Sequence, residues 1–325
     1  MIIMKGRHEM ERLILDKNDL TILPTLAKDC RISYNSIGSQ IGLTSKSVKA
    51  RVKNMVRSGV IERFIVRVNP AAFGYRIALI LTKTNNGITK DDVVQRVKQF
   101  GDLAYHVHHM GRTSVAALLI KKSLNDNIIK SLNDYLIPAT VINIAVTEPS
   151  VYTDLSETDL RIVKCLLLSG ARTEVSDIAK EVGISEKTTT RRLDRMKDGC
   201  LLDFSIQCSP AAMIGYIQFA IPISVGKSHY RSVLERMYSE FQENILYSPS
   251  VIEPEDRLTF VLFGENVFTV DSVMDRVNSF KGVKSADVYI LTKWQYHDEW
   301  IMKEINSRLL PQPLLRKSTK GMFCA

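Results

Sequence analysis

The sequence repeats itself after about 140 residues, and this repeat limits the possible folds more than any other feature of the chain. The segment PAAFGY at residues 70–75 returns as PAAMIGY at residues 210–216. Upstream, Asp19 matches Asp159 and Arg51 matches Arg192 at nearly the same separation. Because the chain has 325 residues, each copy occupies close to half of it. A repeat of this length predicts one structural unit that is used twice.

The first half of each copy begins with helical periodicity and then changes to strand periodicity. In the first copy, apolar residues recur at helical spacing over residues 16–29, 33–41 and 45–58. Gly42 can form the turn before the third helix, and Thr44 or Ser45 can cap that helix. The segment VIERFIVRVN at 60–69 alternates apolar and polar residues, which predicts a strand or hairpin. Three short helices followed by a β-wing predict a winged helix-turn-helix.

The second copy has the same order, with helices expected over residues 160–167, 175–182 and 185–199. Two local irregularities stand out. Pro24 lies inside the first helix of the first copy and predicts a kink, because proline cannot donate the helical hydrogen bond. When Gly59 is aligned with Gly199, the second copy lacks one residue before the glycine. That deletion predicts a shorter last turn in its third helix.

The second half of each copy mixes strands and helices. In the first copy we expect a strand at 76–84, a helix at 90–100, a hairpin at 103–120, a helix at 124–136 and a strand at 139–147. In the second copy the corresponding ranges are 216–225, 228–243, 245–263, 266–280 and 283–293. The order βαββαβ is that of a ferredoxin-like fold. An amphipathic stretch over 294–310 is a candidate helix, and the tail from 311 is expected to be flexible.

These patterns predict an α+β fold in which a winged helix-turn-helix followed by a βαββαβ ferredoxin-like domain occurs twice. The expected boundaries are 1–70 and 155–210 for the helix-turn-helix units. They are 71–154 and 211–295 for the ferredoxin-like domains, and 296–325 for a C-terminal helix with a basic tail.

Composition narrows the class of protein. The formal net charge is +9, which favours a polyanionic partner. Residues 15–70 carry a net charge of +6, whereas residues 155–210 are neutral. No apolar run approaches the ~18–20 residues of a membrane span, and the N-terminus lacks the apolar core of a signal peptide, so we expect a cytoplasmic protein. The five cysteines form no Cys-x-x-Cys pair, which disfavours a zinc ribbon or redox motif.

The third helix of the first unit, SKSVKARVKNMVRSG, is the candidate DNA reader. In a helix-turn-helix, the second helix of the motif enters the major groove with its N-terminal residues at base edges. We expect Ser45, Lys46, Ser47 and Lys49 to face the groove. Arg51, Lys53 and Arg57 are better placed for phosphates or for intramolecular pairs.

The equivalent helix of the second unit carries a weaker signal. Its candidate DNA contacts are Lys187, Thr188, Thr190 and Arg191. Glu186, Asp194 and Asp198 oppose these cations. A working reader and a degenerate or protein-binding copy both remain open.

The whole arrangement resembles the Lrp/AsnC (feast/famine) family of prokaryotic transcription regulators, and it does so twice. The first copy matches the family's signature at Leu15, Asp16, Asp19, Ile22, Leu23, Leu26, Asp29, Arg31, Ile32, Ser33, Ile37, Gly42, Leu43, Thr44, Val48, Arg51, Gly59, Val60, Ile61, Pro70, Gly74 and Tyr75. The second copy matches at Leu155, Asp159, Ile162, Ile178, Ala179, Gly183, Ile184, Ser185, Arg192, Gly199, Pro210, Gly215 and Tyr216.

The resemblance implies a DNA-binding transcription regulator whose partner is double-stranded DNA. Members usually carry one unit per chain and dimerise, so two fused units imply an intrachain pseudo-dimer or a homo-oligomer. The family's effector domain has a glycine followed three residues later by an aspartate near a site for an amino-acid-like effector. Here the matching positions are Gly111 with Ser114, next to Arg112, and Glu253 with Asp256. Each copy keeps one member of the pair.

Two other functions use the same architecture. One is a siroheme-decarboxylase-like enzyme, for which His106, His108 and Arg112 would be the acid and carboxylate-binding groups. The other is an architectural protein that binds DNA with little sequence preference. On a strand, His106 and His108 share a face and form a plausible metal pair, but no further ligand follows nearby in sequence. We therefore expect a regulator rather than an enzyme, with no catalytic residues, no cofactor and no metal.

Overall fold

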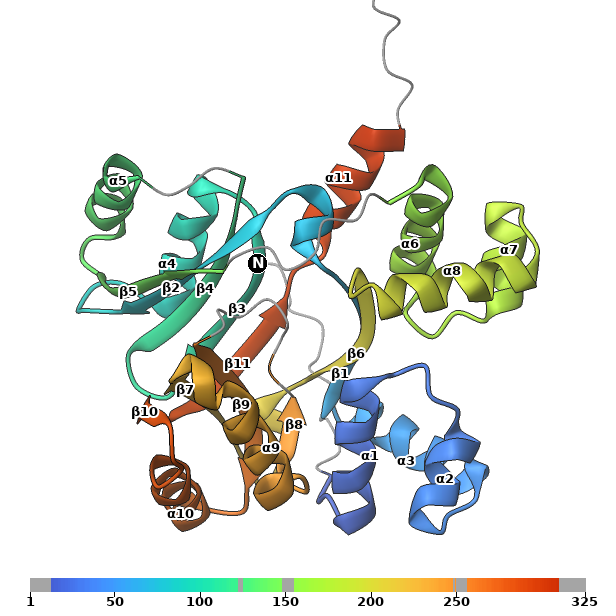
Figure 1. Cartoon of the computed structure of the whole chain (residues 1–325), viewed down its shortest axis with the longest axis horizontal. Helices are drawn as coiled ribbons and strands as arrows, with labels where there is room; N and C mark the ends of the chain where they lie inside the picture. Colours follow the sequence, from blue (N-terminus) through green and yellow to red (C-terminus); the bar gives the residue numbers. More distant parts are fainter. Residues whose placement is uncertain (1–12, 122–124, 148–154, 248, 250–255, 310–325) are drawn as a thin grey trace, which may run out of the picture.

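The computed structural model describes residues 13–121, 125–147, 155–247, 249 and 256–309. Within them, two helix-turn-helix units lie beside a long antiparallel sheet whose outer face carries helices (Figure 1). This arrangement confirms the expected α+β class with its duplicated units. The terminal segments 1–12 and 310–325, including the predicted basic tail, lie outside the described residues. No helix in the described part is long and apolar enough to cross a membrane.

The first helix-turn-helix unit has the expected three helices, α1 (Lys17–Lys28), α2 (Tyr34–Ile41) and α3 (Ser45–Arg57). The Asp16 carboxylate accepts from the Asp19 backbone N–H, and Asp19 accepts in return, so α1 begins with a capping box. Gly42 adopts a φ of 71° between α2 and α3, a conformation that glycine reaches without steric cost. The helix α1 continues through Pro24 to Lys28.

The second unit has α6 (Glu157–Ser169), α7 (Val175–Val182) and α8 (Glu186–Asp198). The predicted deletion at the end of its third helix is wrong, because Gly59 is equivalent to Cys200 and not to Gly199. Gly59 and Cys200 both follow the helix end with positive φ, at 78° and 52°. The helices α3 and α8 therefore have equal length, 13 residues each.

The extra residue of the first copy lies instead in the strand that follows. The strand β1 (Ile61–Val68) is one residue longer than β6 (Leu202–Cys208). The two strands pair antiparallel, and their register shifts between Ile61 and Arg63, so Glu62 forms a bulge.

This pairing decides between the strand and the hairpin that the sequence left open after the third helix. Each unit contributes one strand rather than a hairpin, and each strand finds its partner in the other unit. The guanidinium of Arg67 donates to both carboxylate oxygens of Asp203 at 2.7 and 2.8 Å across this ribbon. The two helix-turn-helix units are thus joined as a pseudo-dimer within one chain.

The ferredoxin-like halves follow the PAA motifs, which form short 3₁₀ turns at Pro70–Phe73 and Pro210–Ala212. The first half comprises β2 (Arg76–Lys83), α4 (Lys90–Val97), β3 (Leu103–His109), β4 (Thr113–Ile120), α5 (Asp126–Leu136) and β5 (Thr140–Val146). The second comprises β7 (Ile217–Val225), α9 (Tyr230–Phe241), β8 (Ile245–Tyr247), β9 (Arg257–Gly264), α10 (Val267–Asn278), β10 (Val283–Ala286) and β11 (Tyr289–Tyr296).

The strand order is β5-β2-β4-β3-β11-β7-β9-β8, with β10 also pairing with β7. In each half the first and third strands are central, as in a ferredoxin-like sheet. The last strand of the second half splits into β10 and β11, and β11 continues across to pair with β3 of the first half. One sheet therefore spans both halves of the described chain.

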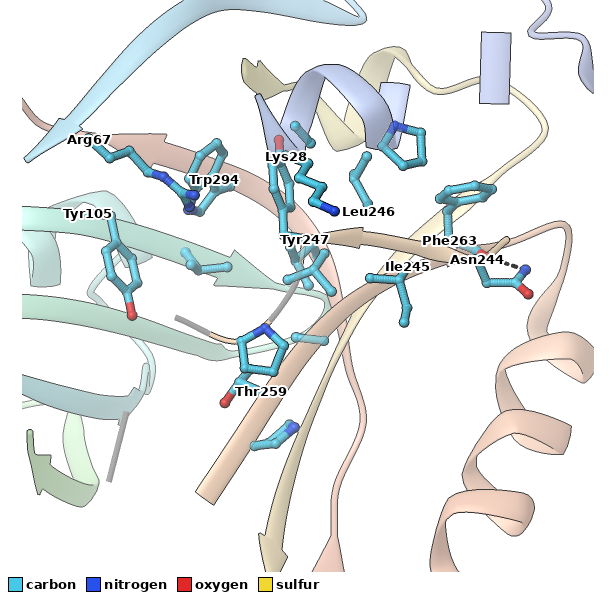
Figure 2. Close-up of a pocket in the computed structure, with 18 of the residues that line it drawn as sticks. Lys28, Arg67, Tyr105, Asn244, Ile245, Leu246, Tyr247, Thr259, Phe263 and Trp294 are labelled. Atoms are coloured by element: carbon cyan, nitrogen blue, oxygen red, sulfur yellow. Dashed lines mark hydrogen bonds between the residues drawn. The ribbon is translucent and has the colours of Figure 1, made fainter. Parts of the chain in front are cut away.

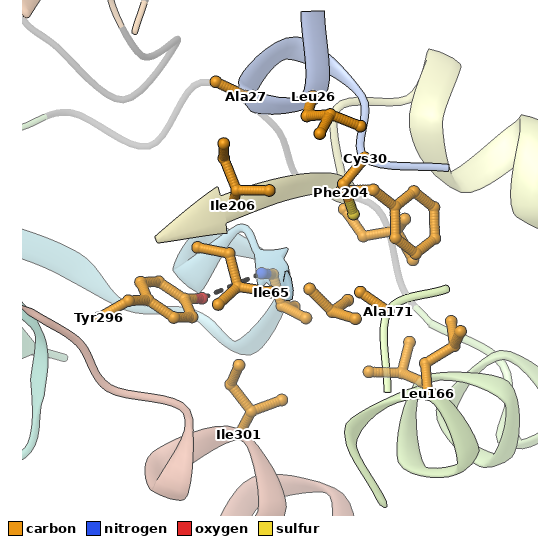
Figure 3. Close-up of a cluster of buried hydrophobic side chains, with 14 of the residues drawn as sticks. Leu26, Ala27, Cys30, Ile65, Leu166, Ala171, Phe204, Ile206, Tyr296 and Ile301 are labelled. Carbon is orange, nitrogen blue, oxygen red and sulfur yellow. Dashed lines mark hydrogen bonds between the residues drawn. The ribbon is translucent and has the colours of Figure 1, made fainter. Parts of the chain in front are cut away.

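This extended strand also corrects the position of the C-terminal helix. We expected a helix from residue 294, but Trp294 and Tyr296 pair with β3. The helix α11 begins only at Glu299 and runs to Leu309. It packs on α6 and closes a core shared by both helix-turn-helix units, in which Ile65, Phe204 and Ile301 are buried (Figure 3).

Candidate nucleic-acid interface

The exposed side of α3 carries a continuous stripe of cations. Lys46, Lys49, Lys53 and Arg57 are spaced three and four residues apart, so they lie within about 80° of arc at 100° per residue. Val48, Val52 and Met55 on the other side are buried in the core. Three of the cations, Lys46, Lys49 and Lys53, point away from the protein as exposed side chains, and Arg57 also donates to Asn54 at 3.0 Å.

The hydroxyl residues at the start of α3 are exposed as well. Thr44 caps the helix by accepting from the Ser47 backbone N–H at 3.1 Å. Ser45 and Ser47 lie beside Lys46 in the first turn, where a groove-reading helix presents its contacts.

Arg51 forms an intramolecular pair, one of the two roles that the sequence left open for it. Its guanidinium donates to Asp16 at 2.7 Å and to Asp19 at 3.0 Å. Burial raises the pKa of Asp16, but the hydrogen bond from the Asp19 backbone N–H and the pairing with Arg51 outweigh burial and hold this pKa below its ordinary value. Arg51 therefore ties α3 to the start of α1 and positions α3 instead of extending its cation stripe.

The second unit repeats the positioning pair but not the stripe. Arg192 donates to Asp159 at 2.9 Å, as Arg51 does to Asp19, and Arg195 also pairs with Asp159. The residues of α8 that correspond to the cation stripe are Lys187, Thr190, Asp194 and Asp198. Four positive charges on α3 thus become one positive and two negative charges on α8.

Of the other residues expected to contact DNA in this unit, Arg191 is exposed on α8. Thr188 is half-buried and its hydroxyl lies 2.9 Å from that of Ser185, the N-cap. Arg191 shares its side of α8 with Asp194 and Asp198, so its charge is opposed locally.

A large cavity lies on the face of the sheet that the outer helices leave open (Figure 2). Its volume is about 2040 Å³. Its apolar lining comes from alternate residues of both halves, among them Leu79, Val107, Ala220 and Val261. Basic groups from the helix-turn-helix side, including Lys28 and Arg67, also line it. A space this large between the ferredoxin-like halves and α1 can hold an organic molecule.

The four residues expected to bind an effector do not line this cavity. Gly111 occupies the β3–β4 turn with a φ of 77°, and Arg112 is exposed beside it. The Ser114 hydroxyl is buried and lies 3.0 Å from that of Thr82, toward the helix-covered face. Asp256 is exposed at the start of β9, where its carbonyl accepts from Val225.

The histidines of β3 alternate between the two faces of the sheet. His109 lines the cavity together with Tyr105 and Val107, so His106 and His108 point to the opposite face. The decarboxylase alternative needs His106 and His108 inside a substrate cavity. Their position on the other face removes the residue-level support for that alternative.

His106 and His108 instead meet groups that are distant in sequence. His106 Nδ1 lies 2.9 Å from His297 Nε2, and His108 Nε2 lies 3.9 Å from Asp91 Oδ1. Lys293 donates to the same Asp91 oxygen at 2.8 Å. Burial lowers the pKa of His106 to about 3 and that of His108 to about 4, so both rings are neutral at ordinary pH. Sequence reasoning found the histidine pair but missed Asp91 and His297, for which it offered no local signal.

Both helix-turn-helix segments match known families. Residues 15–62 match the winged helix-turn-helix DNA-binding family, and residues 155–197 match the AsnC-type helix-turn-helix domain. Among the solved structures, the siroheme decarboxylase NirDL with an iron-uroporphyrin III analogue is 15% identical with a TM-score of 0.48, covering 90% of this chain and all of NirDL. AsnC of E. coli is 18% identical with a TM-score of 0.32, covering 43% of this chain and 94% of AsnC.

The similar sequences are named as regulators. LrpA of Pyrococcus horikoshii, an HTH-type transcriptional regulator, is 30% identical over 87 residues, which are 27% of this chain and 62% of LrpA. Ptr1 of Methanocaldococcus jannaschii, also named an HTH-type transcriptional regulator, is 25% identical over 130 residues, or 40% of this chain and 87% of Ptr1. The alignment with LrpA spans less than two thirds of that protein. With two helix-turn-helix units in tandem, the second of AsnC type, the chain is a relative of the Lrp/AsnC transcriptional regulators.

Proposed function

We propose that the chain is a DNA-binding transcription regulator that contacts the duplex mainly through α3. The cation stripe on α3, centred on Lys46, Lys49 and Lys53, is the observation that carries this proposal. A stripe of exposed cations on the second helix of the motif is suited to the negatively charged walls of the major groove. Ser45 and Ser47 would add base-edge contacts. The proposal includes no catalytic step.

The two units would act unequally on one DNA site. The β1–β6 pairing supports an intrachain pseudo-dimer, so both recognition helices can face DNA without a second chain. The cations of α3 favour tight contact at one half-site. The mixed charge of α8 favours weak contact at the other, through Lys187, Thr190 and Arg191. We therefore expect an asymmetric operator with one dominant half-site.

The salt dependence of duplex binding tests this function. If Lys46, Lys49, Lys53 and Arg57 each neutralise one phosphate, the affinity should fall about 150-fold between 50 and 200 mM salt. Replacing Lys46 and Lys49 by alanine removes two such contacts and should reduce that fall to about 12-fold. The matched control replaces Lys187 and Arg191 by alanine and should change the affinity much less. Undetectable duplex binding at low salt would refute the proposal.

Selection from a random duplex pool separates a regulator from an architectural protein. A regulator should enrich one sequence, and its affinity for that sequence should exceed its non-specific affinity by about 10³ or more. Footprinting of the enriched duplex should show stronger protection at the α3 half-site.

Regulation by a small molecule forms part of the proposal, with the cavity as its site. The apolar lining from both halves, with Lys28 at the helix-turn-helix side, suits an amino-acid-like molecule whose carboxylate pairs with Lys28. A thermal-shift screen of amino acids and related carboxylates tests this. A Leu79→Trp variant that fills part of the cavity should reduce any shift that the wild type shows, and no shift with any of these ligands would refute this part of the proposal.

A further inference from the structure

We propose that Asp91, His106 and His108 bind one divalent transition-metal ion of the zinc class. Among the described residues, one ligand atom from each of these side chains lies within 4.8 Å of the other two. Asp91 lies in the first turn of α4, and the histidines lie on the face of β3 that α4 covers. Two imidazoles and one carboxylate are a donor set that transition metals favour, whereas Mg²⁺ and Ca²⁺ prefer oxygen ligands alone. The site goes beyond the proposed DNA-binding role and does not depend on it.

The two histidine nitrogens that would bind the metal lack partners. His106 is 3% exposed and His108 is 5% exposed. The Nε2 atoms of both rings are buried, and no group in the described part of the chain hydrogen-bonds to them. A buried nitrogen without a partner has lost its water without compensation, which costs free energy. One metal ion between the two Nε2 atoms would satisfy both.

His297 supplies the second feature of a metal-binding histidine. A ligating histidine usually donates its other ring N–H to a neighbouring acceptor, which fixes the tautomer and the direction of the ring. When Nδ1 of His106 carries the proton, it donates to His297 Nε2 at 2.9 Å and leaves the Nε2 lone pair of His106 free for the metal. Glu299 Oε2 lies 3.7 Å from the Nδ1 of His297 and continues this chain of polar groups.

The geometry requires only a small movement. Ligand atoms around a tetrahedral zinc ion lie about 3.3 Å apart, given metal–nitrogen and metal–oxygen bonds of about 2.0–2.1 Å. His108 Nε2 and Asp91 Oδ1 are 3.9 Å apart, and the Asp91 side chain is 65% exposed, so it can rotate inward. Three protein ligands would leave the fourth position for water or a small ligand.

The Lys293 ammonium would compete with a metal ion for the Asp91 carboxylate. This ammonium lies 2.8 Å from Asp91 Oδ1, and the Lys293 side chain is 42% exposed. When a metal binds, this ammonium either keeps one carboxylate oxygen or turns out into water. Removal of the Lys293 charge should therefore strengthen metal binding, whereas removal of the Asp91 charge should weaken it. A purely structural ion pair would give no such opposite effects on metal affinity.

The site lies at the junction between the two halves of the sheet. His106 and His108 are on β3, Lys293 is on the neighbouring β11, and His297 begins the link to α11. A bound ion would stabilise this junction, because a ligand that binds only the folded state raises the stability of that state.

The test uses the full chain without an affinity tag, stripped of metal and titrated with Zn²⁺ by calorimetry and with Co²⁺ by absorption. We expect one equivalent of Zn²⁺ and visible Co²⁺ bands without the near-ultraviolet absorption of a thiolate ligand. Asp91→Asn keeps the size of an exposed side chain and should fold normally, but its affinity should fall more than the about 10–100-fold that loss of a second-shell partner costs. His297→Ala should show that smaller loss, and Lys293→Met should bind more tightly than the wild type.

His229→Gln is the matched control, since His229 lies in a 3₁₀ turn of the second half, away from the site, and should leave binding unchanged. Zn²⁺ should raise the Tm of the wild type and of His229→Gln but not that of Asp91→Asn. The proposal is overturned if the wild type binds no equivalent of Zn²⁺. It is equally overturned if Asp91→Asn and Lys293→Met shift the affinity in the same direction, or if Co²⁺ reports thiolate ligation.

Discussion

Removal of the buried carboxylate of Asp159 should open the second helix-turn-helix unit. This side chain is fully buried between α6 and α8. It accepts from the Ser156 backbone N–H at 3.0 Å and from Arg192 at 2.9 Å, and it also pairs with Arg195. In Asp159→Ala, the Ser156 backbone N–H at the start of α6 and the guanidinium groups of Arg192 and Arg195 all lose their shared acceptor.

The size of the effect follows from this geometry. Breaking a buried ion pair by removing one partner costs about 3–5 kcal/mol, because the remaining charge stays buried. The side chains of Arg192 and Arg195 are 26% and 52% exposed, so water can solvate part of their charge. We therefore expect the lower end, about 3 kcal/mol, which corresponds to about a 150-fold rise in the opening equilibrium.

Hydrogen exchange measured by mass spectrometry can locate this change. Amides of α6 and α8 should lose about two orders of magnitude of protection, whereas those of α1 and α3 should lose much less. Asp194→Ala removes an exposed acid from the same helix and should change the free energy of unfolding by no more than about 0.5 kcal/mol. Equal exchange in Asp159→Ala and Asp194→Ala would refute the reasoning.

Three further predictions concern the pKa of Asp159, the packing of Gly38 in α2 and the surface charge of α8. Burial raises the pKa of Asp159, but hydrogen bonds from Ser156 and Arg192 outweigh it and hold this pKa below its ordinary 3.8. The contribution of Asp159 to stability is therefore complete above about pH 4 and is lost as the pH falls through the lowered pKa. Circular dichroism during acid titration should show this loss in the wild type and a smaller loss in Asp159→Asn. A Cβ at Gly38 would lie 2.2 Å from the Leu43 carbonyl oxygen. Gly38→Ala should therefore lower the free energy of unfolding by about 1–3 kcal/mol and weaken duplex binding. The control Ser39→Ala, at an exposed position, should change neither the stability nor the affinity for DNA. The triple variant Thr190→Lys, Asp194→Lys and Asp198→Arg rebuilds the cation stripe on α8. The slope of the logarithm of duplex affinity against the logarithm of salt concentration should become steeper by up to about 3. An unchanged slope would mean that α8 does not approach DNA.

Local patterns predicted most of the elements, because helix and strand periodicity depend on neighbours only two to four residues apart. The turn at Gly42, a cap at Thr44 or Ser45 and the charge contrast between α3 and α8 were readable in this way. The end of the third helix was misread because two glycines were matched by residue type. Backbone conformation aligns Gly59 with Cys200, and the extra residue lies in a bulge of β1.

By itself, then, the sequence determined a duplicated α+β chain with a basic third helix in its first unit. Tertiary structure alone decided which strand edges pair, because an open edge presents the same backbone donors and acceptors to any partner. The strand β1 pairs with β6, and β3 pairs with β11. These two pairings create the pseudo-dimer and the continuous sheet. The β3–β11 pairing places Lys293 against Asp91, 202 residues away, and His297 against His106. No local sequence pattern predicts these long-range contacts, because they depend on how whole helices and strands pack.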